Sequence, residues 1–327
     1  MKKPVVFSGV QPSGNLHIGN YLGAIAQWVV MQEKNQCIFC VVDYHAITVK
    51  QNPEILKKKI IEIAKIYLVL GIDPKKSIIF QQSDISAHTE LAWILNCVAR
   101  MSDLKKMTQF KDKAGEEEEN VSVGLFDYPV LMASDILLYN TDVVPVGDDQ
   151  SQHVELCRDL ARRFNSQFGN TFKVPELVVK KEGARIMGLD DPTKKMSKSA
   201  KSEYNYVSLI DKPEVAVKKI MKAVTDSGSE IKYDLKNKPA IANLLTIYSL
   251  LADQPIKKLE DKYKGKGYGD FKKDLAEVVK NFLTDFQKKY NKISDKEVKK
   301  ILDEGAEKVR IIADETLKRA KEKIGVN

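Results

Sequence analysis

Short apolar segments alternate with longer amphipathic segments through the first half of this chain. Residues 4–10, 37–43 and 77–81 are predicted to be buried strands, whereas residues 17–34 and 53–70 repeat their apolar positions at helical spacing. Buried strands separated by helices are typical of βαβ units, in which the strands run parallel. The sequence therefore predicts an α/β fold built on a Rossmann-like, doubly wound parallel sheet.

The second half extends this pattern and then changes to helix alone. The elements predicted after the third strand are a helix over 86–112, a helix over 125–139, a strand over 143–147, a helix over 148–164 and a strand over 174–179. Beyond a lysine-rich loop at 194–202 the pattern is almost wholly helical. We therefore predict a Rossmann-type domain over 1–195 and an all-helical domain over 196–327, with the last helix packing back on the first domain.

Length and composition fit a folded cytoplasmic protein. A chain of 327 residues with 43% hydrophobic and 30% charged residues is long enough to bury a full core. The apolar run near the N-terminus is too short for a signal peptide, and no apolar stretch approaches the roughly 20 residues of a membrane-spanning helix. We therefore expect a cytoplasmic protein that has no membrane partner.

The four cysteines are too scattered to form a disulfide framework, which fits a reducing compartment. Cys37 and Cys40 have the CxxC spacing of many metal sites. They fall within a predicted strand, however, where residues three apart face opposite sides. We therefore predict two buried thiols at these positions and no structural metal.

The net charge of +8 is concentrated in the C-terminal part of the chain. Residues 201–327 contain 28 Lys and Arg against 21 Asp and Glu, whereas the first 200 residues are nearly neutral. Such an excess suits the docking of a polyanion, although a lysine-rich helical surface is more often simply solvated.

A polar turn follows the first predicted strand. Residues 11–20 read Gln-Pro-Ser-Gly-Asn-Leu-His-Ile-Gly-Asn and lead directly into a predicted helix. Unpaired N–H groups at a helix N-terminus favour phosphate, and Gly19 lets a flat base approach the backbone. His17 and Asn20 are the candidate polar contacts, although a loop that merely caps the helix explains the same residues equally well.

A second polar segment, residues 194–199, reads Lys-Lys-Met-Ser-Lys-Ser. Mobile ammonium groups beside hydroxyls suit a leaving pyrophosphate, whose charge grows in the transition state. Taken alone, the segment is explained more simply as a basic surface loop. The chain contains no Walker-type GxxxxGK[ST] sequence, which disfavours a P-loop NTPase.

Together the two segments resemble the paired signatures of the class I aminoacyl-tRNA synthetases. The HIGH-type tetrapeptide is His17-Ile-Gly-Asn20, and the KMSKS sequence lies at residues 195–199, in the order that the family has. Asn20 departs from the terminal histidine of the class-wide motif, in a way that resembles the tryptophan and tyrosine branch. The resemblance implies an enzyme that activates an amino acid with ATP.

A single carboxylate interrupts the apolar helical segment over 128–139. Asp135 shares a helical face with Tyr128, Met132 and Ile136. A carboxylate on such a face is costly unless a group donates a hydrogen bond to it. An indole N–H is a fitting donor because the rest of its ring is apolar, and a neighbouring backbone or arginine group is the alternative.

The segments at 132–142 and 144–150, followed by His153, resemble the signature of the bacterial tryptophanyl-tRNA synthetases, and the resemblance covers essentially the whole chain. It implies that Asp135 binds the indole nitrogen. The apolar walls of the ring pocket are then Phe7, Met132, Ile136, Val144 and Val146. The polar residues implied are Tyr128 and Gln150 for the substrate amino group, Gln11 near its carboxylate, and His45 in support of the pocket.

The same resemblance implies the residues that bind ATP. They are Gln11, Pro12, Ser13, Gly19, Asn20, Gly147, Asp148, Asp149, Ile186, Lys195, Met196, Ser197, Lys198 and Ser199. The implied catalytic residues, which stabilise the phosphates, are Lys113, Lys195, Lys198, His17 and Asn20. By composition alone, Lys113 is a solvated lysine, and Asp148 or Asp149 is a helix cap.

The resemblance implies a tryptophan–tRNA ligase reaction in two steps. Tryptophan reacts with ATP, which carries Mg²⁺, to give tryptophanyl-adenylate and pyrophosphate, and tryptophan is then transferred to tRNA(Trp). The resemblance also implies a homodimer through helices that follow the third strand, and an anticodon-binding role for the helical region.

Three alternative functions stay open at this stage. The position of Asp135 on a Met/Ile face argues against a tyrosine–tRNA ligase. The complete loop at 194–199 argues against a small-molecule nucleotidyltransferase. A non-catalytic RNA-binding relative is expected to have lost Lys113, Lys195 and Lys198, all of which are present.

Overall fold

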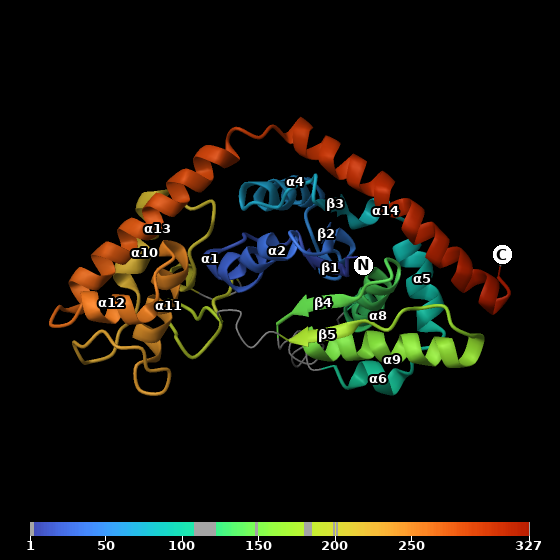
Figure 1. Cartoon of the computed structure of the whole chain (residues 1–327), viewed down its shortest axis with the longest axis horizontal. Coiled ribbons are helices and arrows are strands. Elements are labelled where there is room, and N and C mark those ends of the chain that lie inside the picture. The colour runs from blue at the N-terminus through green and yellow to red at the C-terminus, as the bar shows by residue number, and fades with distance from the viewer. Residues whose placement is uncertain are drawn as a thin grey trace. The chain divides into compact units, whose positions relative to one another are not determined.

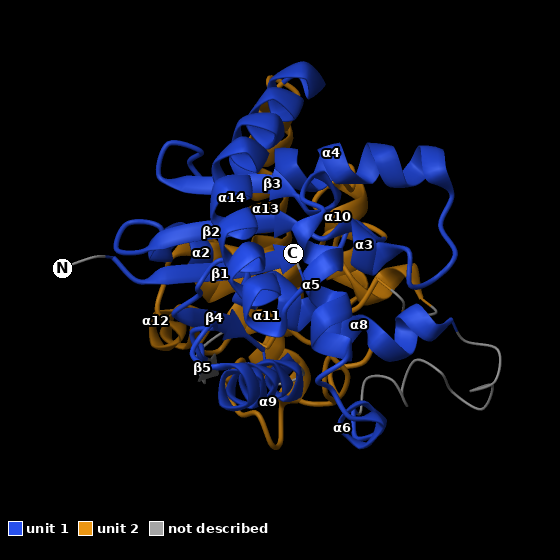
Figure 2. Cartoon of the chain, turned by 90° about the vertical axis from the view of Figure 1, so that its right-hand side faces the viewer, with its two compact units in different colours: residues 1–13, 28–181, 294–327 blue, residues 14–27, 182–293 orange. Residues whose placement is uncertain are grey.

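The structure, a computed structural model, describes residues 3–107, 122–147, 150–179, 185–198, 200 and 202–326. Two compact units are formed by interleaved segments of the chain (Figure 2). Unit 1 consists of residues 1–13, 28–181 and 294–327, and unit 2 of residues 14–27 and 182–293. The chain thus crosses between the units more than once, whereas the sequence predicted a single boundary at residues 195 and 196.

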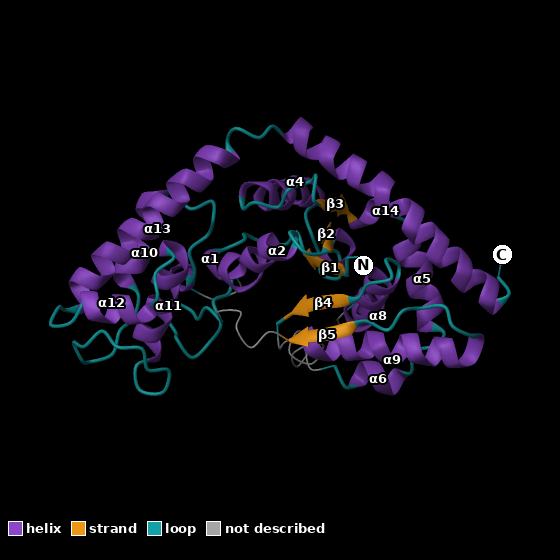
Figure 3. Ribbon diagram, viewed as in Figure 1, coloured by secondary structure: helices purple, strands orange, loops and turns teal. Residues whose placement is uncertain are grey.

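A five-stranded parallel sheet forms the centre of unit 1, as the sequence predicted (Figures 1 and 3). Its strands are β1 (Val5–Val10), β2 (Gln36–Val41), β3 (Ser77–Gln81), β4 (Val143–Val146) and β5 (Glu176–Val179). The strand order β3-β2-β1-β4-β5 places the topological switch point between β1 and β4. In open α/β sheets, ligands bind beyond the carboxyl ends of the strands at this point.

Helices surround this sheet. In unit 1 they are α3 (Asp43–Ala46), α4 (Pro53–Val69), the 3₁₀-helix η2 (Gln82–Asp84), α5 (Ala87–Asn96), α6 (Met101–Lys105), α8 (Val123–Leu137), α9 (Ser151–Phe168) and α14 (Asp295–Ile324). The prediction of one helix over 86–112 is wrong, because α5 ends at Asn96. Arg100 has an extended backbone and donates its N–H to the Asp103 carboxylate at 3.1 Å, which starts a new helix.

Helix α14 lies against the edge strand β3 and beside α5 (Figure 1). The contact is close because residue 305 is a glycine. A Cβ atom at Gly305 would lie 1.8 Å from the Ile79 carbonyl oxygen. Arg310 also donates a hydrogen bond to the Asp84 carbonyl at 2.9 Å. The helix therefore covers a strand edge that would otherwise be open to pairing.

The strands β1 and β2 form the buried interior of unit 1. Phe39 of β2 stacks on Trp28 with ring centroids 4.9 Å apart. Cys37 and Cys40 are both buried and neither forms a disulfide, which confirms the prediction of buried thiols. None of the helices in the described part of the chain is long and apolar enough to cross a membrane.

The regular elements in the described part of unit 2 are all helices, joined by loops (Figure 3). They are α1 (Ile18–Asn20), the π-helix η1 (Tyr21–Ile25), the 3₁₀-helix η5 (Glu203–Asn205), α10 (Pro213–Lys222), α11 (Pro239–Ala252), α12 (Ile256–Lys262) and α13 (Tyr268–Tyr290). Helix α13 buries Phe271, Leu275 and Val279 and packs against α10 and α11.

One predicted helix of this region is interrupted. The sequence predicted a continuous helix over 17–34, but α1 passes into the π-helix η1, and only then does α2 (Ala26–Met31) begin. The wider turn of a π-helix often marks a functional position within a helix.

Candidate functional site

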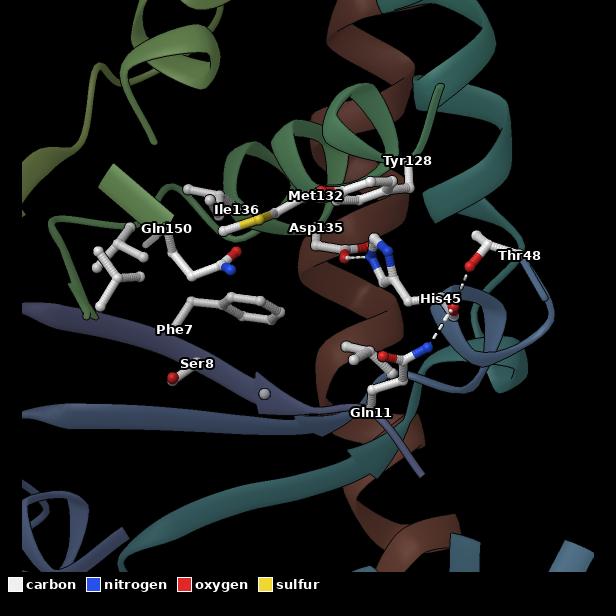
Figure 4. Close-up of a pocket in the computed structure, with 14 residues that line it drawn as sticks. Phe7, Ser8, Gln11, His45, Thr48, Tyr128, Met132, Asp135, Ile136 and Gln150 are labelled. Atoms are coloured by element: carbon white, nitrogen blue, oxygen red, sulfur yellow. Dashed lines mark hydrogen bonds and ion pairs between the residues drawn. The ribbon is translucent and has the colours of Figure 1, made fainter. Parts of the chain in front are cut away.

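A cavity of about 240 Å³ lies in unit 1 at the switch point of the sheet (Figure 4). Its lining residues are Phe7, Ser8, Gly9, Gln11, Val42, His45, Thr48, Tyr128, Met132, Asp135, Ile136, Val144, Val146 and Gln150. All ten residues that the sequence predicted around tryptophan are in this set. The structure thus brings together side chains that are up to 143 residues apart in the sequence.

Each wall of the cavity comes from a different element. Strand β1 supplies Phe7, strand β4 supplies Val144, and α8 supplies Met132 and Ile136. Phe7 is itself supported from behind by Tyr139, on which it stacks with ring centroids 5.5 Å apart. The walls are therefore apolar, and Phe7 is packed against a neighbouring ring, which suits a flat, apolar ligand.

The Asp135 carboxylate is the charged group of the cavity, and both of its oxygens accept hydrogen bonds from the protein. Its Oδ2 accepts a hydrogen bond from His45 Nε2 at 2.8 Å, and its Oδ1 accepts from Gln82 Nε2 at 2.7 Å and from His88 Nδ1 at 2.6 Å. The sequence left a backbone or arginine donor open as the alternative to a ligand. In the structure the protein donors are neither of these, but two histidines and a glutamine.

The two histidines keep Asp135 ionised. Burial alone would raise the pKa of this carboxyl group, because a charged carboxylate is poorly solvated in the interior. The adjoining His88 and His45 outweigh burial and hold the pKa of Asp135 well below its usual range. The cavity thus presents a fixed negative charge beside apolar walls.

The sequence analysis missed Ser8, Gly9, Val42 and Thr48 of the cavity lining, and it also missed Gln82 and His88, which donate to Asp135. Gln82 follows directly after β3, at the carboxyl end of a parallel strand where polar residues gather around ligands. That position is a usable signal. His88 lies within an apolar helical stretch and gives no signal in the sequence, because the Asp135 that it contacts is 47 residues away.

The remaining polar residues of the cavity are also oriented by hydrogen bonds. The Tyr128 hydroxyl lies 3.0 Å from His153 Nε2, and His153 Nδ1 lies 2.9 Å from Gln150 Oε1. Gln11 donates to the His45 carbonyl at 2.6 Å (Figure 4). Two side chains predicted to hold the substrate amino group are thus joined through one histidine.

The two signature motifs meet within unit 2. Ile18 donates its N–H to the Val207 carbonyl at 3.0 Å, and Leu209 donates to the Leu16 carbonyl at 2.9 Å. This pairing joins the segment around His17 to residues 207–209, which follow the lysine loop (residues 194–199). A Cβ atom at Gly14 would lie 2.6 Å from Cδ of Lys198, so that the glycine makes room for the lysine.

His17 itself is neutral at pH 7. Burial lowers its pKa to about 4, assisted by the positive charges of Lys198 and Lys195. Its Nδ1 accepts a hydrogen bond from the Asn20 N–H at 3.3 Å, while Asn20 Oδ1 accepts from the His17 N–H at 3.1 Å. This reciprocal pairing leaves His17 Nε2 as the ring nitrogen that carries the proton.

We expect the lowered pKa of His17 to be visible in stability. Its folded pKa of about 4 is below the ordinary 6.5, so the unfolded chain binds a proton first as the pH falls. The contribution of His17 to the free energy of unfolding should therefore be constant above pH 6.5. It should decline as the pH falls from 6.5 to about 4. Urea unfolding of wild type and His17→Gln across this interval checks it, and parallel curves for the two proteins would contradict the expectation.

The other residues predicted to bind ATP are distributed over both units. Gln11, Pro12, Ser13 and Gly147 belong to unit 1, and Gly19, Asn20, Ile186 and residues 195–198 to unit 2. The Ile186 carbonyl accepts a hydrogen bond from the Met196 N–H at 3.0 Å, which ties it to the lysine loop. Lys113, Asp148, Asp149 and Ser199 lie outside the described residues.

Comparison with known proteins identifies the family of the chain. Residues 1–284 match the family described as class I tRNA synthetases (W and Y). A tryptophan–tRNA ligase of Caldanaerobacter subterraneus subsp. tengcongensis is 57% identical over 321 residues, which cover 98% of each chain.

Two solved structures are similar over almost the whole chain. The tryptophanyl-tRNA synthetase of Mycoplasma pneumoniae matches with a TM-score of 0.93 and 38% identity, over 100% of this chain and 99% of that one. That of Campylobacter jejuni, complexed with ADP and tryptophan, matches with a TM-score of 0.84 and 42% identity, over 98% and 100%. The chain therefore belongs to the class I tRNA synthetases of the tryptophan and tyrosine family, as the two sequence motifs predicted.

Proposed function

We propose that this enzyme is a tryptophan–tRNA ligase. It activates L-tryptophan with ATP, forming tryptophanyl-adenylate and pyrophosphate, and then transfers tryptophan to tRNA(Trp). The relative at 57% identity carries this name, and a similar solved structure contains tryptophan together with ADP.

The observation that carries the proposal is the ionised Asp135 carboxylate among apolar walls. Indole fits such a cavity, because it is a flat apolar ring with a single N–H donor. The phenylalanine ring has no N–H or O–H group, so no ligand group would donate a hydrogen bond to the Asp135 carboxylate. Sites built around a buried polar partner reject analogues that lack the matching group by about 10⁴-fold or more. We therefore assign Asp135 to the indole nitrogen, with Tyr128 and Gln150 at the amino group and Gln11 near the carboxylate.

Catalysis in this proposal consists of positioning and of charge stabilisation. The tryptophan carboxylate attacks the α-phosphate of ATP, so that no protein nucleophile is needed. Lys195 and Lys198 stabilise the charge that develops on the leaving pyrophosphate, and the neutral His17 donates a hydrogen bond to the phosphates. Lys113 is assigned to the same task from the family resemblance.

Mg²⁺ belongs to the proposal as the ion that accompanies ATP. Its oxygen ligands in such enzymes come largely from the nucleotide phosphates and water. Within the described ranges, no group of three or more His, Cys, Asp or Glu side chains is arranged to hold a metal ion.

The proposed partners are tRNA(Trp) and a second copy of the chain. The basic excess of residues 201–327 suits the tRNA backbone, and α10 to α13 provide the helical surface assigned to the anticodon arm. Trp93 on α5 is 71% exposed and Met101 at the start of α6 is 62% exposed. Such exposed apolar side chains support a homodimer through α5 and α6. We assign the reaction to the cytoplasm.

Amino-acid-dependent exchange of pyrophosphate into ATP tests the activity. Exchange that requires tryptophan, followed by charging of tRNA(Trp), is the expected result. Exchange with tyrosine in place of tryptophan would overturn the substrate assignment. Absence of exchange with every amino acid would overturn the enzymatic function.

The lysine loop offers a matched pair of variants. Lys198→Ala should lower kcat for exchange by about 100-fold, which is the typical loss when one stabilising group is removed from a transition state. Lys194→Ala should leave kcat unchanged, because the Lys194 side chain is 81% exposed and pairs with Asp191 at 3.5 Å, and alanine keeps the backbone hydrogen bonds of this residue. Equal rates for the two variants would remove Lys198 from the catalytic set.

A further inference from the structure

The Asp135 carboxylate is held from behind by two elements that contribute nothing to the cavity lining. Gln82 lies in η2 and His88 in the first turn of α5, and neither residue lines the cavity. Both are completely buried, and both donate to the same carboxylate oxygen, Oδ1. Burial of two such donors behind a charged group indicates a function beyond packing.

The polarity of both contacts is fixed by further hydrogen bonds. Gln82 Oε1 accepts the backbone N–H of Tyr44 at 3.0 Å, so its amide nitrogen must face Asp135. His88 Nδ1 must carry a proton, since an ionised carboxylate only accepts. His88 Nε2 then accepts from the Tyr139 hydroxyl at 2.7 Å. The Ser134 hydroxyl also donates to the His88 carbonyl at 2.7 Å, which joins α5 to α8.

This arrangement directs the remaining acceptor capacity of Asp135 into the cavity. A carboxylate oxygen accepts about two hydrogen bonds, so Gln82 and His88 saturate Oδ1. Oδ2 accepts from His45, which itself lines the cavity (Figure 4). The second acceptor position of Oδ2 is therefore on the side where a ligand binds.

We propose that His88 is the positioning residue that fixes the direction and the charge of the Asp135 carboxylate, and that it thereby sets the preference of the enzyme for a ring that carries an N–H. The inference rests on the proposed function of Asp135. His88 touches no substrate in this scheme and acts only through Asp135, in contrast to His45.

If His88 controls the charge of Asp135, its loss should change the pH dependence of tryptophan binding, which the loss of a packing contact would not do. Asp135 faces His88 from α5, His45 from α3, Cys40 from β2, Cys157 from α9, and Tyr139. Of these, the two histidines lower its pKa and oppose the effect of burial. When His88 is lost, the pKa of Asp135 should rise, and a protonated carboxyl group offers one acceptor fewer. Tryptophan binding should then weaken as the pH is lowered.

A pair of amide variants separates the two nitrogens of His88. The amide nitrogen of asparagine occupies the place of Nδ1, whereas that of glutamine reaches the place of Nε2. His88→Asn therefore retains a donor to Asp135, and His88→Gln retains only a partner for Tyr139. Both variants remove the ring that stacks on Phe80 at 5.9 Å, so their loss of packing is similar.

The measurement is pyrophosphate exchange with L-tryptophan and with β-(benzothiophen-3-yl)-alanine, an isostere in which sulfur replaces the N–H. His88→Gln should lower the ratio of kcat/KM for tryptophan to that for the isostere by about 10- to 100-fold, the value of one charge-assisted hydrogen bond. Its KM for tryptophan should rise more steeply than that of the wild type as the pH is lowered, while the KM for ATP stays constant. His88→Asn should keep the wild-type ratio.

The outcomes distinguish this inference from the function on which it rests. A wild-type enzyme that uses both compounds equally would overturn the assignment of Asp135 to the indole N–H. A wild-type preference that survives in His88→Gln would overturn only the role of His88. Equal losses in both amide variants, without a pH dependence, would show that the His88 ring serves packing alone.

Discussion

Replacement of Asp135 by asparagine will reduce kcat/KM for tryptophan in pyrophosphate exchange by about 10⁴-fold, because the site loses the acceptor on which its discrimination depends. An amide has one oxygen and two N–H donors. It would face the donors of His45, Gln82 and His88 and leave at least one of them unpaired. The indole N–H would then compete for the single remaining oxygen.

The same helix offers a control for this change. Asp127 also lies on α8, is partly buried, and accepts a hydrogen bond from Asn96 at 2.8 Å, but it does not line the cavity. Asp127→Asn should keep kcat/KM within a few-fold of wild type. If Asp135→Asn activates tryptophan as well as Asp127→Asn does, the assignment of Asp135 to the indole nitrogen is wrong.

Gly305→Ala should destabilise unit 1 by about 3 kcal/mol or more, at the upper end of what overpacking costs. The added Cβ would lie 1.8 Å from the Ile79 carbonyl oxygen. Because this oxygen belongs to the backbone, a change of side-chain rotamer cannot relieve the clash. Helix α14 must therefore move away from β3. Thermal unfolding, followed by circular dichroism, measures the effect.

Gly269→Ala serves as the matched control. Gly269 lies in the first turn of α13, where a Cβ would meet nothing within 4 Å, so alanine should be neutral or slightly stabilising. A Gly305→Ala protein that melts with the wild type and the Gly269→Ala control would show that α14 is not tightly seated on β3.

The sequence predicted the elements of the fold better than their assembly. Apolar periodicity is a local signal, and it identified all five strands of the sheet. The break between α5 and α6 was missed, because it depends on one backbone N–H of Arg100 that pairs with Asp103 and not on any change in hydrophobic pattern. Interleaving of the two units was also missed. It depends on pairing between residues near 17 and 208, and no local pattern specifies a contact of that length.

The candidate site shows the same division. The helical face of α8 placed Asp135 beside Met132 and Ile136, and the family resemblance supplied most of the other lining residues, but not Ser8, Gly9, Val42 or Thr48. The donors to the carboxylate came from three separate segments, 90, 53 and 47 residues away in sequence. A single sequence contains no record of which distant side chain satisfies a buried charge.

The packing of α14 against β3 has a consequence during synthesis of the chain on the ribosome. Residue 305 leaves the ribosome long after Ile79, and at about 5–20 residues per second the delay is about 10–45 s. During that interval β3 is complete, yet its outer edge has no cover. Strand edges of this kind pair readily with other chains. The nascent chain is therefore most prone to aggregate before α14 is synthesised. A polypeptide that is released early, without α14, keeps the open edge of β3 permanently.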